Sequence, residues 1–315
     1  MISDGPVRSG LRIAGVTVAY LVLFTPAYGL LMPPPPADGP SSDAAALALL
    51  AVAALNTAVI SWLVLRARWR SWQLIGPLIL VFYGVQTVLP QIETIIFRSF
   101  PGFAGHVPAD LGPRLLVAGL IHAALWIPAA VVILRRHKGG PATDSSVRRT
   151  PATLTELGWK LLLASITYVV VYFTFGYYIA WRDPAVTSYY GGIDPGSFWR
   201  QLQSVMRDTP WLPLAQALRG VLWGVLAIVV TRMIQGSVVE KALAVGTLFA
   251  VVMSAGLLLP NPYMPYAVRM AHLVETGSSN FLFGAVVGWL FAERPSLPSR
   301  SVPAAGQTRN SGDLA

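Results

Sequence analysis

Eight long apolar runs dominate the chain and limit how it can fold. A helix needs about 20 apolar residues to cross the hydrocarbon core of a bilayer, because every backbone polar group must be paired within the segment. The runs cover residues 13–32, 44–65, 74–97, 115–134, 161–181, 211–231, 242–259 and 266–292. The sequence therefore predicts an all-α, multi-pass membrane domain over residues 1–294, with about eight transmembrane helices.

The composition agrees with a chain that is solvated by lipid. Charged residues make up 12% of the 315 residues and apolar residues 54%, whereas soluble domains carry roughly 25% charged residues. The net charge of +9 comes from arginines in the short stretches between apolar runs, which favours contact with anionic lipid headgroups over nucleic acid. The chain has no cysteine, which excludes disulfides, thiolate catalysis and iron–sulfur clusters.

The basic residues also predict an orientation. With eight spans both termini lie on one side, and most lysines and arginines fall on that side, which the positive-inside rule makes cytoplasmic. We therefore expect a plasma or inner membrane protein with cytoplasmic termini. Residues 197–207, with apolar side chains near one face, predict an interfacial helix. The tail, 295–315, is rich in Pro, Ser and Gly and predicts a disordered segment.

Two short matches indicate a possible 4+4 repeat of spans, and one of them is the likeness of "VLPQIE" at the end of the third run to "LLPNPY" at the end of the seventh. "LFTPAYGLL" in the first run and "YFTFGYYIA" in the fifth share Phe24/Phe173, Thr25/Thr174 and Tyr28/Tyr177. Repeats are common in transporter folds, which bind substrate at the repeat interface. Chance similarity between short apolar segments is the competing explanation.

Polar and ionisable residues recur inside four of the apolar runs. Counting about 1.5 Å per residue from the cytoplasmic ends places their ionisable residues in the outer half of the membrane. An unpaired charge at such a depth costs at least about 2–3 kcal/mol, so we expect a polar cavity that opens to the extracytoplasmic side. The expected lining residues are Gln86, Gln91, Glu93, His122, Arg219, Arg269, His272, Glu275, Ser279 and Asn280.

The last run carries the strongest functional candidates. His272, Glu275 and Ser279 are spaced i, i+3, i+7 and so share one face of a helix. An imidazole beside a carboxylate can carry a proton or bind a polar substrate. Further along the same run, Gly284 and Gly288 form a small-xxx-small face on which another helix can pack closely.

Structural explanations remain open for the charged candidates. Glu93 and Arg269 lie near enough to the predicted interface to reach the headgroups. Arg219 and Glu275 are candidates for an ion pair that locks two helices together.

The uncharged candidates also have structural alternatives. His122 can be a packing histidine, and Ser279 and Asn280 can form hydrogen bonds between helices. The aromatic residues between 168 and 181 are expected to serve packing and an interfacial belt.

One six-residue stretch, "ETIIFR" at 93–98, resembles the first motif of the CAAX-protease and bacteriocin-processing membrane endopeptidases. In that motif a double glutamate precedes an aromatic–arginine pair, which implies an activating pair of carboxylates. Thr94 stands at the second glutamate here, and Ala118 stands where a Phe-x-x-x-His motif ending at His122 would begin. The sequence therefore does not identify the chain as a member of this family.

Other catalytic signatures do not occur in the sequence. It contains no P-loop, no dinucleotide-binding glycine motif, no HExxH and no GxSxG, so common ATP-dependent and hydrolytic sites lack their motifs. His106, His122, His272 and a glutamate are a conceivable zinc set, but their spacing does not specify one. We expect no cofactor and no metal.

Three functions follow from these features. The first is a permease or flippase of a small solute or lipid headgroup, in which His272 and Glu275 couple proton or substrate and an arginine serves as counter-ion. The second is an intramembrane enzyme at the outer leaflet, with Glu93 or Glu275 as general base and His272 as its partner. The third is a structural subunit whose polar residues join helices. The sequence does not indicate the oligomeric state.

Overall fold

The computed structural model describes residues 6–32, 42–98, 101–137 and 153–293, and within these ranges the chain forms helices and no strands. Seven helices in this part of the chain are long and apolar enough to cross a membrane. They are Pro6–Gly29, Ser42–Arg66, Trp72–Phe97, Leu111–Ile133, Leu154–Ala180, Leu212–Met233 and Val238–Leu258. The all-helical prediction is confirmed for these residues, and the seven helices indicate a multi-pass membrane protein.

The eighth predicted span differs from the other seven. It forms a continuous helix of 26 residues, α12 (Tyr266–Phe291), but it is not among the helices that qualify as spans by length and composition. Arg269, His272, Glu275 and Asn280 give this helix its polar character. The count of eight spans therefore stays a prediction, as does the 4+4 repeat, and the tail 295–315 lies outside the described residues.

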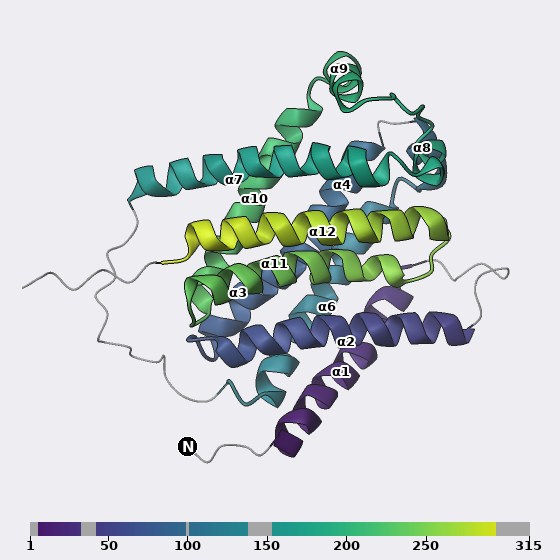
Figure 1. Cartoon of the computed structure of the whole chain (residues 1–315). Coiled ribbons are helices and arrows are strands. Elements are labelled where there is room, and N and C mark those ends of the chain that lie inside the picture. Colours follow the sequence, from purple (N-terminus) through teal and green to yellow (C-terminus); the bar gives the residue numbers. More distant parts are fainter. Residues whose placement is uncertain (1–5, 33–41, 99–100, 138–152, 294–315) are drawn as a thin grey trace, which may run out of the picture.

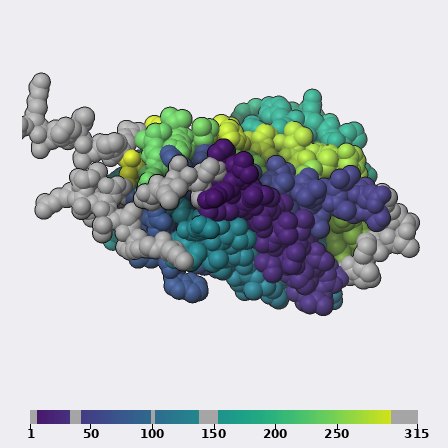
Figure 2. All heavy atoms as spheres, turned by 90° about the horizontal axis from the view of Figure 1, so that it is seen from below, coloured from purple at the N-terminus to yellow at the C-terminus, as the bar shows by residue number. Residues whose placement is uncertain are grey.

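The long helices pack in two groups. α7 (Leu154–Phe175), α12, α11 (Val238–Ser254) and α2 (Ser42–Arg66) follow one another in a row (Figure 1), and each contacts the next. α10 (Leu212–Met233) packs against α7, α12 and α11 of this row and against α3 (Trp72–Tyr83), which packs in turn against α6 (Leu111–Ile133). α1 (Pro6–Gly29) lies on the face seen in Figure 2, beside α2 and α6.

Three of the spans depart from α-helical geometry along their length. A π-helical turn, η1 (Gly84–Val88), separates α3 from α4 (Leu89–Phe97), and a second, η2 (Gly176–Ala180), ends α7. A 3₁₀ turn, η3 (Ala255–Leu258), ends α11. Pro90 follows the first turn and Pro260 the last, and proline has no amide hydrogen with which to continue the α-helical pattern.

Three short helices lie between the spans. α5 (Pro101–His106) and α8 (Pro184–Tyr189) contact each other. α9 (Phe198–Asp208) corresponds to the interfacial helix expected at 197–207, and Ser197 begins it by accepting a hydrogen bond from the Arg200 amide. No residue of α9 is buried, and its position at a membrane interface stays a prediction.

Glycines bring α11 and α12 into close contact. A Cβ atom at Gly284 would lie 2.8 Å from the Gly246 Cα, and one at Gly288 would lie 2.9 Å from the Ala242 Cα. The small-xxx-small face expected on the last run is therefore used against α11, and this is the most extensive helix pair among the described residues.

Candidate functional site

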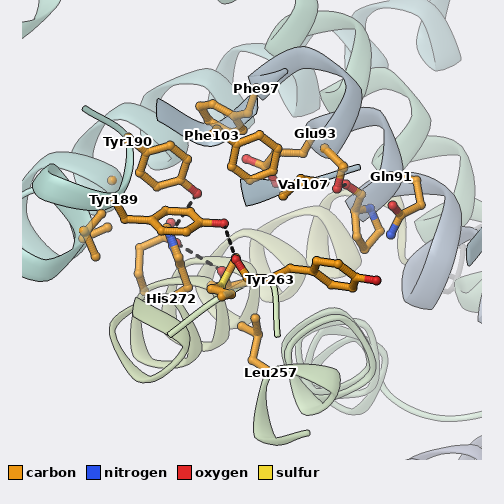
Figure 3. A pocket seen from close by; sticks show the side chains of 18 of the residues that line it. Gln91, Glu93, Phe97, Phe103, Val107, Tyr189, Tyr190, Leu257, Tyr263 and His272 are labelled. Atoms are coloured by element: carbon orange, nitrogen blue, oxygen red, sulfur yellow. Dashed lines mark hydrogen bonds and ion pairs between the residues drawn. The ribbon is translucent and has the colours of Figure 1, made fainter. Parts of the chain in front are cut away.

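A cavity of about 870 Å³ lies at the end of the bundle that carries α5, α8 and η3. This volume falls within the range of small-molecule sites. Its walls are mostly aromatic and aliphatic, and polar side chains enter it from several helices. Figure 3 shows Gln91 and Glu93 on one side, and Tyr189, Tyr190 and His272 on the other. The polar lining residues include Gln86, Thr87, Gln91, Glu93, Thr94, Asp208, His272, Glu275 and Thr276.

On one wall, a carboxylate, an imidazole and a phenol form a connected chain. His272 Nδ1 lies 3.5 Å from Glu275 Oε2, and Tyr190 Oη lies 3.1 Å from His272 Nε2. Thr276 donates a second hydrogen bond to Glu275 Oε2 at 3.1 Å. His272 and Glu275 meet because they are one helical turn apart on α12, whereas Tyr190 comes from the residue after α8. A proton on Nδ1 faces the carboxylate and leaves Nε2 to accept from the phenol.

On the opposite wall, Glu93 pairs with a buried arginine. Arg219 Nη2 donates to Glu93 Oε2 at 3.0 Å and to the Leu89 carbonyl at 3.2 Å, and Nη1 donates to Gln216 Oε1 at 2.7 Å. The guanidinium also lies over the Tyr168 ring, 5.5 Å from its centroid. The candidate ion pair of Arg219 with Glu275 does not form, because α10 presents the arginine to Glu93 of α4 rather than to α12. Glu93 is the member of the pair that lines the cavity.

Tyrosines of the α8 segment close this end of the cavity. Tyr189 donates a hydrogen bond to the Tyr263 carbonyl at 2.8 Å, and burial raises the pKa of its phenol to about 12. Burial, with the nearby charges of Glu93 and Glu275 adding to it, raises the pKa of Tyr190 well above its usual value. Both phenols therefore remain protonated donors at neutral pH.

Close backbone contact holds this aromatic segment in place. A Cβ atom at Gly102 in α5 would lie 2.5 Å from the Tyr190 carbonyl carbon, and Gly191 has a φ of +70°. Glycine alone meets both requirements without strain. The sequence reasoning did not select Tyr189 or Tyr190; the available signal was their position directly before two glycines.

All three departures from α-helical geometry border the cavity. Gln86 and Thr87 of η1, Tyr177 of η2, and Leu257 of η3 are lining residues. In both π turns the hydrogen bond spans five residues, from the Leu89 amide to the Gly84 carbonyl and from the Trp181 amide to the Gly176 carbonyl. Such turns are rare in helices and are frequent at functional sites.

Five of the ten expected residues line the cavity, and the other five do not. The lining residues are Gln86, Gln91, Glu93, His272 and Glu275, and the others are His122, Arg219, Arg269, Ser279 and Asn280. Arg219 nevertheless contacts the cavity through Glu93. Ser279 donates back to the Thr276 carbonyl of its own helix at 3.3 Å, and both Ser279 and Asn280 are buried.

Arg269 closes the end of a neighbouring helix. Its Nη1 donates to the carbonyls of Leu257, Leu258 and Leu259 at 3.0, 3.3 and 2.7 Å. These carbonyls lack partners in their own helix because the chain turns away after η3. The guanidinium therefore fixes the end of η3 against α12 rather than facing the cavity.

The histidines occupy separate surroundings. His122 is 0% exposed, packs edge-on against Tyr20 at 4.5 Å between centroids, and has no hydrogen-bond partner on either ring nitrogen. His106 stacks on Tyr189 at 4.8 Å. Within the described ranges no three His, Cys, Asp or Glu side chains are grouped closely enough to hold a metal ion.

Four of the six residues that the first and fifth runs share in the possible repeat line the cavity, whereas Thr25 and Thr174 do not. Phe24 and Tyr28 from α1 and Phe173 and Tyr177 from the α7–η2 span are all lining residues.

No family model matches the chain, and neither the curated proteins nor the solved structures contain a match to it.

Proposed function

We propose that the protein is a permease or flippase that moves a small solute or a lipid headgroup through the cavity. The observation that carries this proposal is the position of η1, which interrupts one span at the cavity wall, together with η2 and η3, which end two other spans there. Interrupted helices near a binding site are typical of secondary transporters, because they expose backbone groups to the substrate and can bend.

The Glu275–His272 pair is the proposed coupling group. Both side chains are partly exposed to the cavity, and a neighbouring imidazole and carboxylate can exchange a proton as the occupant changes. Glu93 and Arg219 compensate each other's charge, since they are 3.0 Å apart, and are proposed to orient the occupant.

The proposed orientation has the termini in the cytoplasm of a cell membrane and the cavity toward the outer side. Arg66 forms an ion pair with Glu240 at 2.5 Å, and Arg68 donates to the Ile234 carbonyl. Arg66, at the end of α2, thus contacts the first turn of α11, and Arg68, in the segment after α2, contacts the end of α10. The positive-inside rule expects such basic residues on the cytoplasmic face.

An intramembrane enzyme is the second candidate, and the connected chain of Glu275, His272 and Tyr190 favours it. A carboxylate that orients an imidazole, which in turn contacts a hydroxyl, is an arrangement used for proton transfer in catalysis.

Flux measurements distinguish the two candidates. Proteoliposomes that enclose a pH-sensitive dye would be exposed to a library of amines, organic acids and sugars, and fluorescent phospholipids would report flipping through quenching by dithionite. We expect movement of at least one compound or lipid, abolished in Glu275→Gln and retained in Glu156→Gln, a matched change at the partly exposed start of α7. A chemically altered product without net movement would contradict transport and support the enzyme.

A further inference from the structure

We infer that the occupant of the cavity is an organic cation, specifically a protonated amine with an apolar body. This inference deepens the proposed function by naming the substrate class, and it rests on that function only for the claim that the bound amine is moved. Its evidence is the charge balance of the lining, the unpaired acceptors in it and the aromatic rings around them.

The charge balance of the described lining favours a cation. The lining includes the carboxylates of Glu93, Asp208 and Glu275 and no lysine or arginine. Glu93 is neutralised by Arg219 at 3.0 Å, and Asp208 by Arg207 at 2.8 Å. Among the described residues the carboxylate of Glu275 has only His272 and Thr276 as its hydrogen-bond partners, and neither carries a permanent charge. An incoming cation would therefore supply the counter-charge that Glu275 lacks.

Two amide oxygens in the lining also lack a donor. Gln91 is 8% exposed, and its Oε1 has no hydrogen-bond partner in the part of the chain that the structure describes. Gln86 donates through Nε2 to the Tyr20 hydroxyl at 3.2 Å, which fixes its orientation, and its Oε1 is likewise buried and unpaired. A buried acceptor without a donor costs about 1–3 kcal/mol. The N–H groups of an ammonium would satisfy such an acceptor once the amide turns toward the cavity, whereas a carboxylate or phosphate would not.

Aromatic rings supply the remaining surface. Many of the lining residues are aromatic and come from several elements, among them Phe97, Tyr172, Tyr177, Trp181 and Tyr190. The faces of such rings attract cations, and the attraction strengthens when water is excluded. The same rings provide apolar area for the body of the ligand. A small inorganic cation would leave this area unused, so an amine with an apolar body fits the lining better.

Equilibrium binding with three fluorescent probes tests the inference without requiring transport. Monodansylcadaverine is a protonated amine, its N-acetyl derivative is neutral, and 6-(dansylamino)hexanoate is an anion, and all three carry the same fluorophore. The intact protein would be held in nanodiscs of neutral phosphatidylcholine, and empty nanodiscs would give the lipid background. Dansyl emission would be titrated for each probe.

We expect the amine to bind with a Kd about tenfold or more below that of the acetylated probe, a factor that corresponds to about 1.4 kcal/mol. Glu275→Gln should remove most of this preference, Gln91→Leu should weaken amine binding further, and Glu156→Gln should change neither. Equal or tighter binding of the neutral or anionic probe would overturn the inference, as would an amine preference that survives in Glu275→Gln.

Failure of the inference and failure of the proposed function give different results. Amine-selective binding without amine uptake into proteoliposomes would refute transport and leave the cation site intact. Flux of a neutral or anionic compound that depends on Glu275, without amine-selective binding, would refute the cation site and leave transport intact.

Discussion

The ion pair between Arg219 and Glu93 allows the sharpest test of the structure. Arg219 is 1% exposed and donates to three acceptors, whereas Glu93 keeps 27% exposure at the cavity. Arg219→Met preserves most of the side-chain volume but leaves a carboxylate without its cation. Removing one member of a buried pair costs about 3–5 kcal/mol, and the partial exposure of Glu93 places the expected loss near the lower limit.

A double-mutant cycle separates the pair from the remaining contacts of the arginine. Glu93→Gln should also cost about 3 kcal/mol or more, because it leaves the guanidinium of Arg219, which is 1% exposed, without a counter-charge even though the amide oxygen still accepts from it. The double variant Arg219→Met/Glu93→Gln should be more stable than the sum of the two losses predicts, by about 1–2 kcal/mol. Equilibrium unfolding with SDS in mixed micelles, followed by tryptophan fluorescence, measures all four proteins.

The matched control is Arg207→Met. This arginine also pairs with an aspartate, but its side chain is 76% exposed, and exposed ion pairs contribute little to stability. An Arg219→Met loss no larger than that of the control would refute the buried pair. Additive losses in the cycle would show that Arg219 and Glu93 are not coupled.

Three further predictions follow from other parts of the structure. Gly284→Val should weaken the α11–α12 contact and lower the unfolding temperature, because its Cβ would meet backbone atoms at 2.8–2.9 Å, whereas Gly277→Val, with only a serine hydroxyl at 3.7 Å, should change it less. In this cysteine-free chain, Thr276→Cys should react with a membrane-impermeant maleimide and the buried Ser279→Cys should not; equal labelling would contradict the position of the cavity. Burial raises the pKa of Tyr189 to about 12, so the unfolded chain releases the phenol proton near pH 10 and the folded chain only near pH 12. The free energy of unfolding should therefore fall between pH 10 and 12, and less steeply in Tyr189→Phe, which thermal unfolding would measure.

The helices could be predicted because one constraint acts along the whole chain. Backbone groups in a bilayer need partners within the segment, so span-length apolar runs become helices whatever their detailed packing. The run at 266–292 shows the limit of this argument, because Arg269, His272 and Glu275 make it too polar to qualify as a span by composition even though it forms one helix.

The cavity could be predicted in part. Gln86, Gln91 and Glu93 are polar in an otherwise apolar run, and His272 with Glu275 follows helical spacing, so the sequence itself contains these signals. Tyr189 and Tyr190 could not be selected, because they belong to a loop segment without periodicity and reach the cavity only through the contact of α8 with α5. Whether these residues act on a substrate stays a prediction.

The partners of the charged residues could not be predicted at all. Depth in the membrane placed Arg219, Arg269 and both glutamates in the same layer, but depth does not specify which helices are neighbours. In the structure Arg219 pairs with Glu93, and Arg269 instead binds three carbonyls at the end of η3. These choices depend on the order of helices around the bundle, which the single sequence does not encode in any local pattern.

The tight glycine contact between α11 and α12 has a consequence for how the cavity can change shape. Because backbone meets backbone at Gly246, Gly284 and Gly288, the two helices cannot slide or rotate against each other without separating. Any alternating opening must then move the two helices together as one rigid body, which the hydrogen bond from Arg269 to the Leu259 carbonyl joins at one end. His272 and Glu275 would move with this rigid body, toward or away from Glu93, while the bending takes place in the π-helical turns of the surrounding helices.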